Sequence, residues 1–112
     1  MDKVKKLQKA VLALLEQYAA IKSPFMPEVD NKIIADTKSH SYQLIRIGWY
    51  KDRHVHYTVF HFEISDGKII IHENRTDIKV DEELIENGID RKDIISGLQH
   101  PRMLNLQLAD NG

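Results

Sequence analysis

Apolar residues recur at helical spacing near the start of the chain, and charged residues fall between them. The apolar positions are Val4, Leu7, Val11, Leu14, Leu15, Tyr18 and Ile21. At 100° per residue they form one stripe about 120° wide, with Lys5, Lys9 and Glu16 on the opposite side. The prolines of SPFMP, at positions 24 and 27, end this pattern. An amphipathic helix over residues 2–21 is therefore predicted, with one face available to cover a sheet.

From residue 28 the apolar period changes to two, which is the period of a β-strand. The pattern predicts strands over residues 28–36, 42–50 and 55–64, and a fourth strand through IIIH at 69–72. Asp66-Gly67 separates the last two strands and is a strong signal for a two-residue type I′ hairpin. The middle of the chain therefore predicts an antiparallel meander of about four strands.

The two hairpins predict which residues share a face of that sheet, because directly opposed residues in an antiparallel pair point the same way. The Asp66-Gly67 turn places Ile64 opposite Ile69, Phe62 opposite Ile71 and Phe60 opposite Glu73. The turn across residues 51–54 is expected to place Tyr50 opposite Val55. The predicted core face is Ile45, Ile47, Trp49, Phe60, Phe62, Ile64, Ile69 and Ile71. The predicted outer face is Tyr42, Leu44, Arg46, Tyr57, Val59, His61, Glu63, Ile70 and His72.

Two short helices are expected after the sheet. The first runs through EELIE and stops at Asn87-Gly88, where Ile89 could fold back on Leu84. Asp90 is expected to cap a second helix over RKDIIS, and MLNLQLA at 103–109 alternates as a possible last strand. The predicted fold class is α+β: an N-terminal amphipathic helix packed on an antiparallel meander, two short helices and a possible C-terminal strand.

Composition narrows the function classes. The chain has 112 residues, a net charge of −1 and no cysteine, which fits one domain and excludes disulfides and thiolate chemistry. No apolar stretch is long enough to cross a bilayer, and Lys9 and Glu16 interrupt the segment that would resemble a secretory signal. A cytoplasmic protein is expected, without a membrane partner or an evident small-molecule substrate.

Three functions remain open from the residues alone. Lys5, Lys6 and Lys9, with Lys3 and Lys22, could contact DNA directly. His61 and His72, which the predicted register places opposite each other, could form a metal-dependent site with Glu63. The mixed apolar and polar outer face could instead bind a protein, with Arg46, Tyr57, His61 and His72 as the candidate partner-binding residues. No catalytic motif and no cofactor motif is recognisable, so a non-enzymatic role is expected.

Three segments together resemble the XisI-like family, the fdxN-element excision controlling factors found largely in cyanobacteria. They are YQLIRIGW at 42–49, HFEISDGKIII at 61–71 and ELIENGIDRKDIISG at 83–97. The chain departs from the family at three places, one of which is the closing MLNLQLADNG, which is less typical of the family. It reads Ile70-Ile71-His72 where the family often has Trp-Ile-Gln, and Asn74-Arg75-Thr76-Asp77 where the family often has Asp-x-Thr-Glu.

The resemblance implies a single XisI-like domain over residues 1–112. It also implies an accessory role in the excision of a DNA element during heterocyst differentiation, beside a separate companion protein that looks nuclease-like. DNA contact is then indirect or weak, and no family catalytic residue is carried over. A homodimer formed through an open strand edge is a further expectation from the predicted meander.

Overall fold

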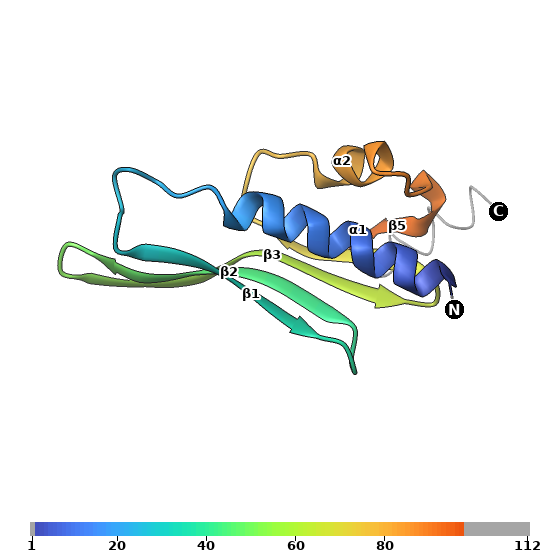
Figure 1. The fold of residues 1–112 in the computed structure, drawn as a ribbon, viewed down its shortest axis with the longest axis horizontal. Coiled ribbons are helices and arrows are strands. Elements are labelled where there is room, and N and C mark those ends of the chain that lie inside the picture. The colour runs from blue at the N-terminus through green and yellow to red at the C-terminus, as the bar shows by residue number, and fades with distance from the viewer. Residues whose placement is uncertain (1, 98–112) are drawn as a thin grey trace.

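A computed structural model describes residues 2–97. Figure 1 shows the helices on one side of a single sheet. The elements are α1 (Asp2–Ala19), β1 (Val29–Asp36), β2 (Ser41–Tyr50), β3 (Arg53–Ser65), β4 (Lys68–Asn74), α2 (Val80–Glu86), a 3₁₀ turn η1 (Arg91–Asp93) and β5 (Ile94–Ser96). The predicted C-terminal strand within 103–109 lies outside the described residues. Within residues 2–97, neither α1 nor α2 combines the length and the hydrophobicity of a membrane-spanning helix.

The sheet has the order β1-β2-β3-β4-β5, so each strand lies beside its neighbour in sequence. The first four strands are antiparallel, and β5 joins β4 in parallel. Both the predicted meander and the predicted α+β class are therefore confirmed.

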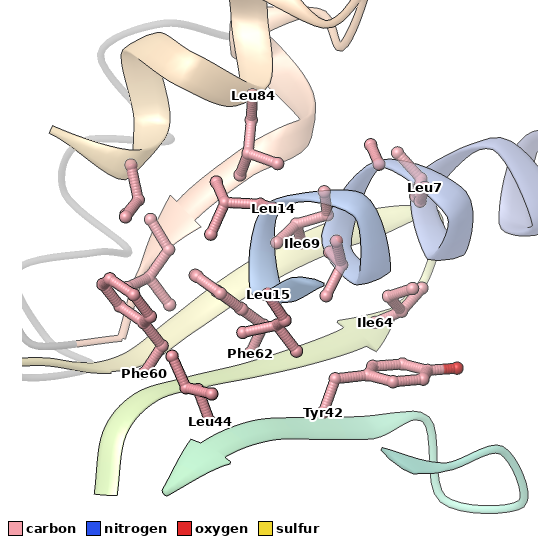
Figure 2. Close-up of a cluster of buried hydrophobic side chains, with 14 of the residues drawn as sticks. Leu7, Leu14, Leu15, Tyr42, Leu44, Phe60, Phe62, Ile64, Ile69 and Leu84 are labelled. Atoms are coloured by element: carbon pink, nitrogen blue, oxygen red, sulfur yellow. The ribbon is translucent and has the colours of Figure 1, made fainter. Parts of the chain in front are cut away.

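The core lies between the sheet and the two helices. Figure 2 shows Leu14 and Leu15 of α1 between the ring of Phe62 below and Leu84 of α2 above. These four side chains are almost completely buried. Burying one such side chain contributes about 1.5–3 kcal/mol, so the amphipathic stripe predicted for α1 explains why the helix covers this face of the sheet.

The β3–β4 hairpin has the predicted turn. Asp66 and Gly67 both have positive φ, at 53° and 71°, as a type I′ turn requires. Ile64 pairs with Ile69 and Phe62 with Ile71, as expected. A bulge then inserts His72 into β4, so His61 pairs with Glu73 and Phe60 pairs with Asn74 rather than with Glu73.

The predicted register of the β2–β3 hairpin is wrong. The turn is Lys51-Asp52, so Tyr50 pairs with Arg53 rather than with Val55. A bulge also inserts Val59 into β3, because Leu44 pairs with Phe60 while Ile45 pairs with Thr58. An extra residue in one strand exchanges the faces on either side of it. Tyr42 and Leu44, predicted to face outward, therefore belong to the core with Val59, and Trp49 is exposed.

The segment after the sheet confirms one predicted helix and corrects the other. Helix α2 ends before Asn87-Gly88, and the backbone N–H of the buried Ile89 donates to the Leu84 carbonyl, as expected. Only the first half of RKDIIS is helical, as the 3₁₀ turn η1, and the Asp90 side chain makes no capping hydrogen bond to it. Ile94–Ser96 instead form β5, because the edge of β4 offers free backbone hydrogen-bonding groups to this β-branched segment.

Candidate partner-binding surface

The sheet extends beyond the C-terminal end of α1. Figure 1 shows the β2–β3 turn and the start of β1 projecting past the helix, beside the connection between α1 and β1. We call the projecting part of β2 and β3, residues 46–57, the arm. Its tip carries Trp49, 52% exposed, and Tyr50, 38% exposed, and the connection carries Phe25, 83% exposed. Large exposed aromatic side chains are therefore concentrated at this end of the molecule.

The aromatic side chains of the arm are held by neighbouring groups. The Trp49 indole lies 5.0 Å from the His54 ring, centroid to centroid, and the Lys51 ammonium lies 5.4 Å from the centre of the Tyr50 ring. The His54 and His56 rings stack in turn, with centroids 6.3 Å apart. These contacts order the side chains without removing them from solvent.

Gly48 joins the arm to the start of β1. The backbone N–H of Trp49 donates to the Glu28 carbonyl, and Val29 pairs with Gly48. Gly48 has φ 154°, and a Cβ at this position would lie 2.1 Å from the Glu28 carbonyl oxygen. Only glycine allows the two backbones to approach this closely.

Arg46 and Tyr57 lie opposite each other at the base of the arm, on the side of the sheet that carries the helices. The Arg46 Nη1 donates to the Tyr57 hydroxyl at 3.1 Å, and its Nε donates to Asn31 Oδ1 at 3.2 Å. Asn31 Nδ2 donates in turn to the Ile21 carbonyl at 2.6 Å. This chain of hydrogen bonds fixes the guanidinium beside the end of α1.

His61 and His72 lie together on the opposite side of the sheet, with ring centroids 5.1 Å apart. The His61 Nε2 is 2.9 Å from Ser41 Oγ, and the His72 Nε2 is 2.7 Å from Glu63 Oε1. Partial burial lowers the pKa of His61, and a charge on His72 lowers it further. The shared face predicted for the two imidazoles is confirmed, although His61 pairs with Glu73 rather than with His72.

Only three of the four candidate partner-binding residues share one surface: Tyr57, His61 and His72 border the same hollow. The bulge at Val59 places Arg46 on the helix side, where it donates to the Tyr57 hydroxyl. Sequence reasoning missed Asn31 and Phe25, and it assigned Trp49 to the core. The exposure of Trp49 follows from the bulge at Val59, so predicting it requires predicting the bulge.

The histidine pair does not extend to a recognisable metal site within residues 2–97. No group of three His, Asp or Glu side chains there has metal-binding geometry. The Nε2 atom of His61 is hydrogen-bonded to Ser41, and the Nε2 atom of His72 is hydrogen-bonded to Glu63. Each imidazole therefore has its own polar partner, and the two nitrogens do not share one ligand.

The lysines considered for DNA binding do not form a uniform basic patch. Lys3 Nζ lies 3.1 Å from Asp93 Oδ1, and Lys22 Nζ lies 3.4 Å from Asp30 Oδ1. Lys6 borders a surface hollow that also contains Asp90 and Asp93. Acidic groups thus offset part of the positive charge that non-specific phosphate binding requires.

Comparison with known proteins identifies relatives. The family model described as XisI protein matches residues 1–107. A crystal structure of a XisI-like protein from Anabaena variabilis ATCC 29413 is similar, with 37% identity, a TM-score of 0.79 and coverage of 89% of this chain and 90% of that one. A second, of the fdxN element excision controlling factor XisI from the same organism, has 25% identity, a TM-score of 0.74 and coverage of 90% and 97%.

A search of the curated proteins gives no match. The family model nevertheless covers nearly the whole chain, and the XisI-like structure shares its fold over nine-tenths of both chains. The chain therefore belongs to the XisI family.

Proposed function

We propose that the protein is a regulatory accessory factor in the site-specific excision of a DNA element, and that it acts by binding a companion excision factor that is nuclease-like. Membership of the XisI family supports the excision role, because a member with the same fold is an fdxN element excision controlling factor. The proposal assigns binding, and no catalytic step, to this chain.

The observation that carries the proposal is the exposure of Trp49 at the tip of the arm. Exposed clusters of large apolar side chains are characteristic of interaction sites. Tryptophan, tyrosine and arginine are enriched among the residues that contribute most binding energy, and Trp49, Tyr50 and Arg53 all belong to the arm. Burying the indole and the phenol against a partner would remove from water two large surfaces that the fold itself leaves exposed.

The proposal is tested by co-expressing the chain with the companion factor and measuring co-purification. The wild-type chain should retain the companion, and Trp49→Ala should reduce its retention by at least about tenfold, as expected for a residue central to an interface. Ile34→Ala is the matched control, because Ile34 is another exposed large apolar residue but lies on β1 away from the arm. Equal retention by Trp49→Ala and wild type would contradict the proposal.

A DNA mobility shift at low ionic strength separates direct DNA contact from protein binding. If the isolated chain shifts duplex DNA, and the shift weakens steeply with added salt, phosphate contact supplies the activity. Such a result, together with no effect of Trp49→Ala on the companion, would replace the proposed function with direct DNA binding.

A further inference from the structure

A pocket of about 190 Å³ lies at the base of the arm, between the end of α1 and the helix side of β2 and β3. Its wall is mainly apolar and includes Leu44, Val59, Phe60 and Ile78, and Asn31 and Arg46 provide polar groups at the same pocket. Pockets that enclose a drug-sized molecule usually measure about 300–1,000 Å³. This pocket is smaller than that range, which suits one side chain of a larger partner better than a whole ligand.

Arg46 brings a positive charge to this apolar pocket. Its Nε and Nη1 atoms are held by Asn31 and Tyr57, so the guanidinium is oriented before anything binds. None of the ion pairs formed within residues 2–97 involves Arg46. A partly buried guanidinium that forms no ion pair within residues 2–97 favours an anionic ligand, and its planar geometry matches a carboxylate in particular.

We propose that this pocket binds a segment of a partner protein that presents one apolar side chain next to a carboxylate. The side chain would contact Phe60 and Val59, and the carboxylate would accept hydrogen bonds from the remaining guanidinium N–H groups of Arg46. A C-terminal leucine carries both groups on one residue and is the simplest segment with this chemistry. The inference rests on the proposed binding of a companion protein, and it adds a second contact region at the base of the arm.

The test is an NMR titration of the ¹⁵N-labelled full chain with the peptide N-acetyl-Gly-Gly-Leu bearing a free carboxylate. We expect saturable shifts at Asn31, Val59 and Ile78. The C-terminal amide removes the charge, and N-acetyl-Gly-Gly-Ala removes most of the apolar side chain, so each should bind at least about tenfold more weakly. Equal binding of the acid and the amide, or shifts confined to other surfaces, would overturn the proposal.

Variants of Arg46 supply an independent check. Arg46→Gln should abolish the preference for the acid over the amide, whereas Arg46→Lys should keep part of it, because lysine retains the charge but not the planar fork. The peptide comparisons on the wild-type chain remain decisive if either variant fails to fold. Binding of 4-methylpentanoate as tightly as the peptide would assign the pocket to a small carboxylate and overturn the partner assignment.

The two proposals fail in different ways. If Trp49→Ala releases the companion factor while Arg46→Gln retains it fully, the pocket proposal fails and the proposed function stands. If wild-type protein does not bind the companion at all, the proposed function fails, and the peptide titration still reports whether the pocket recognises an apolar residue with a carboxylate.

Discussion

The Tyr18 hydroxyl on α1 donates to the Glu83 carboxylate on α2, with both carboxylate oxygens 2.6 Å away. The same ring meets Phe60 of β3 edge to face, with centroids 5.6 Å apart. One side chain therefore connects both helices and the sheet, next to the pocket at the base of the arm. Burial, together with the hydrogen bond and the negative charge of Glu83, raises the pKa of Tyr18 to about 12.

Tyr18→Phe should lower the free energy of unfolding by about 1–2 kcal/mol, because it removes a hydrogen bond to a charged group while keeping the ring. Urea unfolding at neutral pH measures the change. Tyr50→Phe is the matched control, since Tyr50 is exposed at the tip of the arm, and it should leave the unfolding midpoint unchanged. Equal effects of the two substitutions would contradict the role assigned to the Tyr18 hydrogen bond.

Gly48→Ala should destabilise the protein by more than about 2 kcal/mol. The added methyl group would overlap the backbone of Glu28, which cannot move without breaking the pairing of Val29. Gly88→Ala is the control, because Gly88 also has positive φ, at 99°, but no atom lies within 4 Å of the added carbon. That control should cost only about 1–2 kcal/mol, the usual cost of a left-handed backbone. Thermal or urea unfolding of both variants separates two costs. Gly88→Ala reports the cost of the backbone conformation alone, and Gly48→Ala reports that cost plus the steric overlap.

Acidification should destabilise the native state through His61. Its pKa is lowered in the folded protein, so the unfolded chain binds the proton more readily. The contribution of His61 to stability is therefore complete above its unfolded pKa of about 6.5 and is lost as the pH falls through the lower folded value. Unfolding midpoints measured between pH 8 and pH 5 should decrease toward acid.

The contribution of the neighbouring imidazole can be separated with His72→Gln. Removing the like charge should raise the pKa of His61 toward its ordinary value but not restore it fully, because burial is the larger cause of the shift. An NMR titration of His61 measures this directly. A His61 pKa unchanged by the substitution would show that the two rings do not interact electrostatically.

Lys3→Met should destabilise the protein by about 1 kcal/mol, because it leaves the carboxylate of Asp93 without its ionic partner. Asp93 is only 5% exposed, and Lys3 lies 3.1 Å from it. The control is Lys5→Met, an exposed position on the same helix. Urea unfolding should give a lower midpoint for Lys3→Met than for Lys5→Met. Equal midpoints for the two variants would show that the Lys3–Asp93 ion pair does not stabilise the protein.

Local patterns predicted those parts of the fold that depend on short segments. The stripe of α1, the turn at Asp66-Gly67 and the helix stop at Asn87-Gly88 each have their cause within a few residues, and these predictions are confirmed, except that α1 ends at Ala19 and leaves Ile21 exposed. The helix prediction for RKDIIS is wrong for Ile94–Ser96, because their conformation depends on pairing with the edge of β4 rather than on neighbours in sequence. Tertiary pairing overrode a plausible local capping signal.

The candidate site was harder to predict for a related reason. The apolar positions of β3 change phase at Val59-Phe60, from Val55, Tyr57 and Val59 to Phe60, Phe62 and Ile64. This change coincides with the bulge, but the prediction treated the segment as one uninterrupted strand because no glycine or proline interrupts it. The bulge decides whether Trp49 is buried and whether Arg46 shares a face with His61. The joint position of His61 and His72 was predicted correctly because it depends on the nearby turn at Asp66-Gly67.

The bulge at Val59 divides the β2–β3 hairpin into two stretches that contribute differently to the interior. The inner stretch, from Phe60 onward, supplies rings to the interior, so substitutions there disturb folding. The outer stretch supplies few rings to the interior and is attached to the start of β1 at Gly48. Exposed side chains of this stretch, such as Trp49, can therefore be replaced at little cost to the scaffold that carries them.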